Sequence, residues 1–224
     1  MTRRGLFVSL LGGLLVAPFG ATAASRNSRL RYGEDPHQTI EVRAPRGARG
    51  LPVLVVFGGT RVAALRLARG GFVVVSAGLR MAERPPRAMV ADASLATAWV
   101  AARAQTFGGD AARLGVLGLG ASADVALMLA LDRRYMAARG RPDLVRAAGA
   151  MDRPEASARD LTATRPEAYV RSGGPPLWLG GRDPAATMLS VRVAAAGGRS
   201  QSLSRSGGTN LTEAAAAFFL RELI

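Results

Sequence analysis

The sequence predicts an α/β protein in which a mostly parallel sheet is covered by helices on both faces. Short apolar runs, typical of strands buried on both sides, alternate along the chain with helical segments. The chain has 224 residues, 49% of them hydrophobic, which is enough for one sizeable core. Residues 24–224 are therefore expected to form a single domain.

The first half of this domain gives three strand signals and two helix signals. Residues 39–44 (TIEVRA) alternate as a half-buried strand does, and residues 51–59 (LPVLVVFGG) form an apolar run that ends in glycines. Residues 64–69 favour a short helix, and residues 71–78 (GFVVVSAG) a second buried strand. Residues 92–107 are predicted to be a helix that starts at an acidic residue.

The middle of the chain continues the alternation. Residues 113–118 (RLGVLG) predict a strand, residues 123–131 (ADVALMLAL) a helix, and residues 145–151 a weaker strand. The polar, proline-bearing residues 152–174 indicate a loop.

The last part of the chain predicts two strands and two helices. The strands are residues 175–181 (PPLWLGG) and 200–204 (SQSLS), and residues 188–198 form a helix ended by glycines. Residues 211–223 predict the closing helix. Strands and helices in this order favour parallel pairing.

Residues 1–23 are typical of an export signal, with a basic start, an apolar middle and a small-residue end. The pair Arg3 and Arg4 resembles a twin-arginine signal, with an ordinary secretory signal or an uncleaved anchor as alternatives. Cleavage is expected after residues 21–23. No later stretch is long and apolar enough to span a bilayer, so we expect an exported protein, periplasmic or secreted, without membrane contact after signal removal.

The composition limits the chemistry. The chain has no cysteine and one histidine, which excludes disulfides and leaves no cluster of metal ligands. Its formal charge is +14, and all 30 basic residues are arginines scattered through the chain. With only 5% aromatic residues, we expect no specific nucleic-acid binding, and polyanion binding through the arginine excess remains a hypothesis.

Residues 115–124 (GVLGLGASAD) form the most informative motif, a strand that breaks into glycines and opens a helix. Residues 118–123 fit the G-x-G-x-x-A variant of the dinucleotide fingerprint. That fingerprint needs a strand ending in an acidic residue about 20 positions later, whereas the downstream segment is basic and not strand-like. We therefore expect no dinucleotide and no other cofactor.

Residues 31–221 resemble bacterial α/β-hydrolase-fold esterases of the carboxylesterase and lipase type. The resemblance rests on YGEDPHQTIEV, on the long segment from VVVSAGLRMAERPP to LMLALDRRY, and on RPEAYVRSGGPPLWLGGRDP. It implies the α/β-hydrolase fold and a serine nucleophile in a G-x-S-x-G turn.

The family's serine position falls on Gly120 in this chain, with Gly118 and Ser122 as the small flanking residues. On this register the nucleophile is absent. A register two residues later makes Ser122 the nucleophile and puts Asp124 in place of the second glycine. In a structural role, Ser122 and Asp124 would instead bind free backbone N–H groups in the first turn of the helix.

The resemblance also implies an oxyanion hole and a catalytic acid. Gly58 and Gly59 stand where the family has His-Gly-Gly, and Ala121 follows the nucleophile position, so backbone donors are retained without the histidine. Asp183 matches the acid if one residue is deleted, and it fits equally an ordinary loop or capping aspartate.

The general base is missing from its expected place. Thr209 or Asn210 occupies the family's histidine position, and neither can accept the serine proton near neutral pH. Asn210 and Glu213 fit a helix-capping pair. The only histidine, His37, is expected in a surface turn.

Three hypotheses follow. The first is an exported pseudo-hydrolase that retains a pocket for a small acyl or anionic ligand, or for a protein partner. The second is an active carboxylesterase that acts through Ser122 and Asp183. The third is the polyanion-binding protein, whose affinity would fall steeply with salt.

Overall fold

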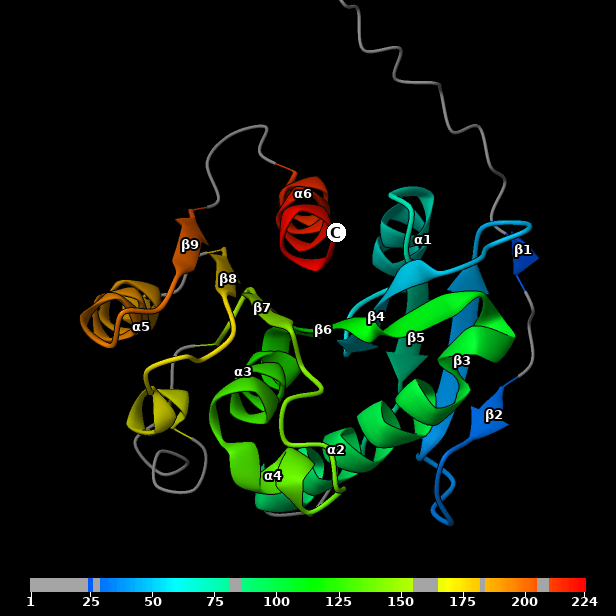
Figure 1. Ribbon diagram of the computed structural model, residues 1–224, viewed down its shortest axis with the longest axis horizontal. Helices are drawn as coiled ribbons and strands as arrows, with labels where there is room; N and C mark the ends of the chain where they lie inside the picture. The colour runs from blue at the N-terminus through cyan, green and yellow to red at the C-terminus, as the bar shows by residue number, and fades with distance from the viewer. Residues whose placement is uncertain (1–23, 26–28, 81–85, 155–164, 182–183, 205–209) are drawn as a thin grey trace, which may run out of the picture.

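The computed structural model describes residues 24–25, 29–80, 86–154, 165–181, 184–204 and 210–224, and within these residues nine strands form one sheet (Figure 1). The strands are β1 (Ala24–Ser25), β2 (Leu30–Arg31), β3 (Thr39–Ala44), β4 (Leu51–Phe57), β5 (Val73–Ala77), β6 (Gly109–Leu119), β7 (Ala147–Met151), β8 (Leu177–Gly180) and β9 (Ser200–Leu203). The predicted strands are all present. The two-residue strands β1 and β2 were not predicted, because a strand of that length carries no periodic signal.

The sheet has the strand order β1-β3-β5-β4-β6-β7-β8-β9, with β2 paired to β3. All pairs from β5 to β9 are parallel, whereas β3 is antiparallel to β5. The prediction of a mostly parallel sheet is confirmed. The carboxyl ends of β4 to β9 therefore lie at one edge, and the amino end of β3 lies at the same edge.

Helices cover both faces of the sheet (Figure 1). They are α1 (Arg61–Arg69), α2 (Pro86–Arg103), α3 (Ala123–Leu131), α4 (Arg133–Ala137), α5 (Pro184–Ala195) and α6 (Leu211–Leu223). Apolar side chains of α2, α3 and α5 pack on one face and those of α1 and α6 on the other. This arrangement gives two core layers separated by the sheet.

Strand β4 explains the two layers. Val53, Val55 and Phe57 point into the layer under α2 and α3, whereas Leu54 and Val56 point into the layer under α1 and α6. All five side chains are buried. A continuous apolar run is what a strand with two covered faces requires.

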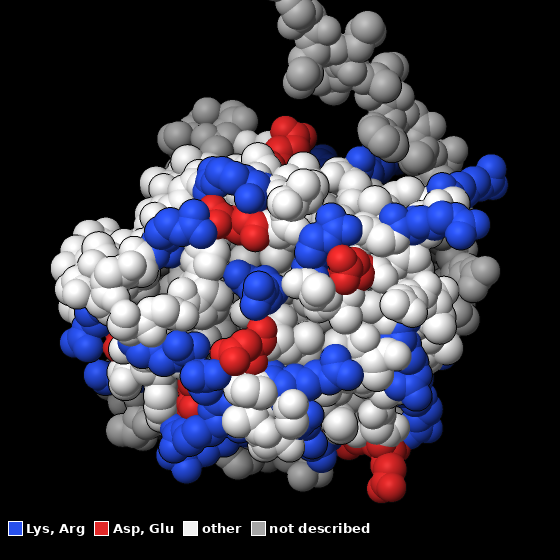
Figure 2. Space-filling view, viewed as in Figure 1, with Lys and Arg blue, Asp and Glu red and all other residues white. Residues whose placement is uncertain are grey.

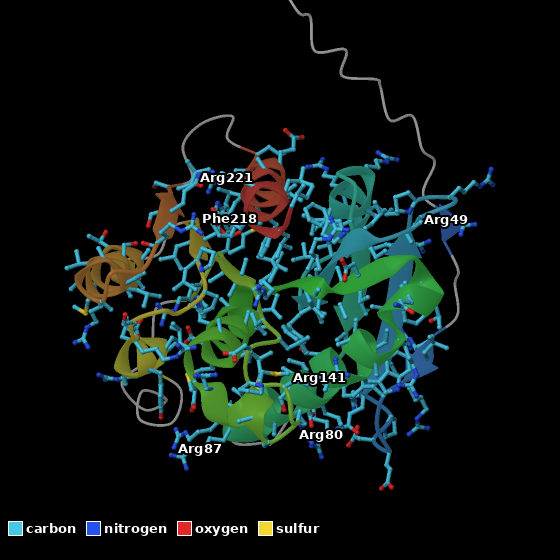
Figure 3. The ribbon with its side chains drawn as sticks, viewed as in Figure 1. Arg49, Arg80, Arg87, Arg141, Phe218 and Arg221 are labelled. Carbon is cyan, nitrogen blue, oxygen red and sulfur yellow. The ribbon has the colours of Figure 1, made fainter. Side chains whose placement is uncertain are left out.

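Helix α6 closes the second layer through Phe219, which is fully buried against the backbone of Gly115 and Gly149. A Cβ at Gly115 would lie 2.9 Å from the Phe219 ring, so the glycine makes room for the helix. Arg221 lies against Phe218 at the same helix, with its guanidinium carbon 5.5 Å from the ring centroid (Figure 3).

Helix α2 starts at Pro86, six residues before the predicted start at Asp92. Proline is favoured in the first turn of a helix, where its missing N–H costs nothing. Asp92 does not cap the helix, because its buried carboxylate accepts hydrogen bonds from Arg80 Nε at 2.7 Å and from Gln38 Nε2 at 2.9 Å. This network ties the residue before β3, the turn after β5 and α2 together.

Candidate functional site

The turn between β6 and α3 is built on two glycines with different tasks. A Cβ on Gly118 would lie only 2.1 Å from the carbonyl oxygen of Ser122, so the backbone passes too close for any side chain. Gly120 has φ +56°, in the left-handed region that favours glycine. A Cβ built on Gly120 meets no atom within 4 Å, so a side chain at this apex would project into open space.

Ser122 lies at the start of α3 and is buried, with 1% of its surface exposed. Its side chain does not cap a backbone N–H of α3, which corrects the structural role expected from the sequence. It packs instead against the loop after β4, where a Cβ on Gly58 would lie 3.2 Å from Ser122 Oγ.

Gly58 and Gly59 directly follow β4, next to the β6 turn, because Phe57 pairs with Gly118 across the two strands. Both glycines have positive φ, at +72° and +83°. After them, Thr60 caps α1 by accepting a hydrogen bond from the Ala63 N–H. The loop thus leads from the carboxyl edge of the sheet straight into a helix N-terminus.

Gly58, Gly59, Ala121 and Ser122 line a cavity of about 890 Å³ at this edge. Three of these residues are the ones that the sequence assigned to an oxyanion hole. The cavity continues along β3 and the end of β5. The structure thus brings the Gly58-Gly59 loop and the β6 turn to one cavity.

The β3 wall of the cavity carries charged side chains that sequence reasoning missed. Arg43 Nη2 donates to Glu41 Oε2 at 2.6 Å, Arg43 Nη1 donates to Ser76 Oγ at 3.3 Å, and Arg29 lies 3.6 Å from Glu41. The hydrogen bond from Arg43 is the main cause that holds the pKa of Glu41 below its ordinary value. Arg61, at the start of α1, completes this wall.

Asp124, in the first turn of α3, forms an ion pair with Arg153 from the segment after β7. Arg153 is 8% exposed and also lies 2.8 Å from the Glu167 carboxylate. Burial lowers the pKa of Arg153, but the Asp124 and Glu167 charges outweigh it and raise the pKa above its ordinary value. Asp124 is therefore part of an ion-pair network. In the register that makes Ser122 the nucleophile, Asp124 is the residue that replaces the family's second glycine.

The remaining triad candidates are placed only in part. Asp183 and Thr209 lie outside the described residues, after the carboxyl ends of β8 and β9. Asn210 caps α6: its Oδ1 accepts from the Glu213 N–H at 3.3 Å, and its Nδ2 donates to Glu213 Oε1 at 2.6 Å. The predicted capping pair is confirmed.

His37 lies in an exposed turn, as predicted, with 74% of its side chain accessible and its Nδ1 3.1 Å from Asp35 Oδ1. The turn precedes β3, and β5 and β4 separate β3 from β6. Three strand spacings of about 4.8 Å put the two strands roughly 14 Å apart. The imidazole is therefore not within hydrogen-bonding reach of the β6 turn.

The dinucleotide interpretation is not supported by the geometry after α3. The chain forms the short helix α4 there, and the acidic residue that follows the next strand, β7, is Asp152, which comes 34 residues after Gly118 instead of about 20. In the described part of the chain, no group of three His, Cys, Asp or Glu side chains could hold a metal ion. Nor does this part contain a helix with the length and hydropathy needed to cross a bilayer.

On the face shown in Figure 2, the arginines of the described residues do not form one block. Figure 2 shows them spread over the visible face with acidic side chains lying between them. The described residues include the ion pairs Arg133–Asp143 and Arg199–Glu222, at 2.7 and 2.8 Å.

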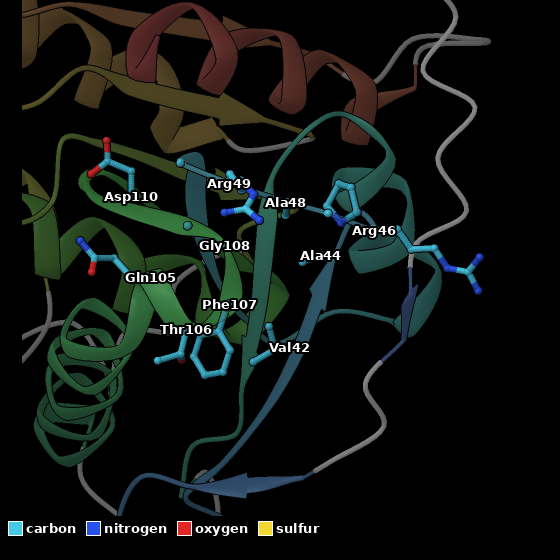
Figure 4. Close-up of a pocket in the computed structure, with 14 residues that line it drawn as sticks. Val42, Ala44, Arg46, Ala48, Arg49, Gln105, Thr106, Phe107, Gly108 and Asp110 are labelled. Atoms are coloured by element: carbon cyan, nitrogen blue, oxygen red, sulfur yellow. The ribbon is translucent and has the colours of Figure 1, made fainter.

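A second cavity of about 780 Å³ lies at the opposite, amino-terminal edge of β4 and β6 (Figure 4). Its lining includes Arg46, Arg49, Gln105, Phe107 and Asp110. This cavity is far from the turn after β6, because the eleven residues of β6 lie between the cavity and that turn.

No protein-family model matches the sequence, and no curated protein matches it either. Solved structures do match. The thermophilic carboxylesterase EstE1, cloned from a metagenomic library, is 20% identical, with 91% of each chain covered and a TM-score of 0.71. Thermogutta terrifontis esterase 2 phosphorylated by paraoxon is 18% identical, with 86% of this chain and 91% of that chain covered and a TM-score of 0.69.

A Pyrobaculum calidifontis esterase is also similar, at 18% identity and a TM-score of 0.67, with 83% of this chain and 82% of that chain covered. The chain therefore has the α/β-hydrolase fold, and its fold is that of bacterial carboxylesterases. The resemblance inferred from the sequence is confirmed at the level of the fold.

Proposed function

We propose that this chain is a non-catalytic protein with the α/β-hydrolase fold, which binds a small acyl or anionic ligand in the cavity beside the β6 turn. The observation that carries the proposal is the glycine, Gly120, at the position where the family has its serine. It occupies the apex of the strand-to-helix turn, has a left-handed backbone, and leaves open the space into which a nucleophile would project.

The serine nearest to the apex supports the same conclusion. Ser122 is 1% exposed and packs beside Gly58, whereas a nucleophile has to reach a substrate carbonyl. The histidine position falls on Thr209 or Asn210, neither of which can act as the base; Asn210 is engaged in capping α6, and His37 lies on a distant turn. A serine without an imidazole partner lacks the group that takes its proton.

The proposal includes export. The basic start, apolar middle and small-residue end of residues 1–23 support a periplasmic or secreted location, and the arginine pair favours the twin-arginine route. Comparing the fractions of a cell that expresses the full chain, with the Arg3 and Arg4 pair intact or changed to lysines, tests this part.

The test of the main proposal is hydrolysis of a panel of short-chain aryl esters, combined with intact-mass measurement after incubation with paraoxon. The wild type, Ser122→Ala and Gly120→Ser are compared at equal, folded concentration. We expect no enzyme-dependent turnover and no covalent adduct in any of the three, because Gly120→Ser restores a hydroxyl without a base.

Turnover by the wild type that disappears in Ser122→Ala would overturn the proposal in favour of an active carboxylesterase. An adduct on the wild type that Ser122→Ala removes would do the same. Turnover in Gly120→Ser alone would mean that a base is present and that only the nucleophile has been lost.

A further inference from the structure

Strand β9 forms an end of the sheet that no other strand of the described residues covers. It is last in the strand order and pairs with β8 alone, and α5 and β9 lie together at this end of the molecule (Figure 1). At the opposite end, β1 and β2 pair with β3. Residues Ser200–Leu203 contain neither a proline nor a charged side chain, which are common means of keeping an edge from pairing. This edge can therefore accept another strand.

The backbone groups on the open side of β9 belong to Ser200 and Ser202. The Leu177 N–H of β8 donates to the carbonyl oxygen of Arg199 at 3.0 Å, so Arg199 is directed toward β8. Successive residues of a strand direct their N–H and C=O groups to opposite sides, so those of Ser200 and Ser202 are directed away from β8. Two donors and two acceptors on alternate residues are the pattern to which an extended peptide pairs.

The two faces of β9 meet different helices. Ser202 Oγ lies 2.8 Å from Ser190 Oγ of α5, whereas Gln201 Oε1 accepts a hydrogen bond from Arg221 Nη2 of α6 at 3.1 Å. Side chains alternate between the faces of a sheet, so a strand added to β9 presents every second side chain to the α5 side and the others to the α6 side.

The α5 side of this edge is apolar. Ala194 lies one helical turn from Ser190, and Val191 and Met188 follow at spacings of three residues, so these side chains are neighbours on the surface of α5. All three are exposed, with 63% of Val191 and 59% of Met188 accessible. Apolar side chains of an added strand would cover this surface and remove it from water.

The α6 side of the edge is positively charged. Arg199 and Arg221 are 73% and 59% exposed, and both pair with the carboxylate of Glu222, at 2.8 and 2.9 Å. Glu222 is 5% exposed, so one buried carboxylate is shared by two exposed guanidinium groups. The excess of positive charge favours acidic side chains on this face of an added strand. It disfavours a second copy of the chain, whose formal charge is +14.

We propose that the open edge of β9 binds an extended segment of a partner protein in which acidic and apolar residues alternate. The segment pairs with β9 as an added strand, its apolar side chains beside Val191 and Met188 and its acidic side chains beside Arg199 and Arg221. None of these residues lines the cavity beside the β6 turn, so the inference is independent of the proposed function. Its chemistry is binding alone, with no bond made or broken.

The test is the fluorescence anisotropy of a labelled heptapeptide, EVEVEVE, titrated with the mature chain. Two comparison peptides separate the contributions: EEEEVVV has the same composition and charge without the alternation, and KVKVKVK has the alternation with the opposite charge. We expect EVEVEVE to bind at least about tenfold more tightly than either, because only this peptide matches the backbone, the apolar face and the charged face together.

Three variants locate the binding. Ser202→Pro removes an N–H on the open side and no bond to β8, and it should weaken binding of EVEVEVE at least about fivefold. Val191→Ser removes exposed apolar surface from α5 and should weaken binding about threefold. Val62→Ser is the matched control, because Val62 is 58% exposed on α1, and it should change the affinity less than about twofold. Circular dichroism checks that each variant is folded.

Equal binding of EVEVEVE and EEEEVVV would overturn the inference, because it would mean general attraction to the arginine excess. An affinity left unchanged by both Ser202→Pro and Val191→Ser would overturn it too, and Val191→Ser alone decides if the proline variant does not fold. Analytical ultracentrifugation of the chain without peptide tests the other occupant. A dimer that Ser202→Pro converts to a monomer would assign the edge to a second copy and refute the partner segment.

Discussion

The two glycines of the β6 turn should respond very differently to the same added methyl group. In Gly118→Ala the new Cβ would lie 2.1 Å from the Ser122 carbonyl oxygen, so the start of α3 has to shift by about 1 Å to reach normal contact. We expect the free energy of unfolding to fall by about 3 kcal/mol or more. In Gly120→Ala the methyl meets nothing, and only the left-handed backbone opposes it, at about 1–2 kcal/mol.

Urea unfolding followed by tryptophan fluorescence measures both values, because Trp178 is fully buried in the layer under α1 and α6. Gly47→Ala is the control for backbone conformation alone: Gly47 has φ +70° and also has no atom within 4 Å of a built Cβ. Gly47→Ala should lower the free energy of unfolding by as much as Gly120→Ala does. If Gly118→Ala lowers it no more than these two variants do, the close backbone contact at Gly118 is refuted.

Two further predictions concern the fold around the site. Asp92→Asn should lower the free energy of unfolding at pH 7 by about 2 kcal/mol, because Arg80 loses its carboxylate partner. Although burial raises it, hydrogen bonds from Arg80 and Gln38 hold the pKa of Asp92 below its ordinary value. The stabilisation that the ionised Asp92 carboxylate provides is therefore present above about pH 4 and is lost at lower pH. The free energies of unfolding of the wild type and the variant, measured in urea, should converge as the pH falls below this value. Phe219→Ala should cost about 3–5 kcal/mol in thermal or urea unfolding, against about 1 kcal/mol for the half-buried Leu220→Ala, and similar losses would contradict the packing of α6 on Gly115.

The sequence predicted the order of strands and helices well because the sheet is buried on both faces. Runs such as residues 51–57 and 73–77 are apolar at every or nearly every position, and glycines mark where they end. The boundaries of α2 and β6 were less accurate. Asp92 was predicted to start a helix and Arg113 to start a strand, but each lies inside its element. The charge of Asp92 is paired with a side chain farther along the sequence, and that of Arg113 with a side chain three residues away.

The charged wall of the cavity could not be predicted from the sequence. In residues 39–44, Glu41 and Arg43 alternate with apolar residues, which is the pattern of a strand with one face in water. Arg43 is buried only because β3 pairs with β5 and the N-terminus of α1 lies nearby. Such burial depends on contacts between segments far apart in the chain. Arg153 was missed for the same reason, since its partners lie in α3 and in the segment before β8.

The geometry of the β6 turn explains how a nucleophile can be absent while the turn keeps its shape. Gly118 is required by the close approach of two backbone segments, and this requirement exists whether or not a reaction takes place. The apex is different, since any side chain there has to adopt a strained left-handed backbone at a cost of about 1–2 kcal/mol. Enzymes accept such strain because the exposed hydroxyl is needed for chemistry. In a chain that only binds its ligand, glycine at the apex removes the strain and alters no packing contact, so Gly120→Ser should make the protein less stable than the wild type without giving it activity.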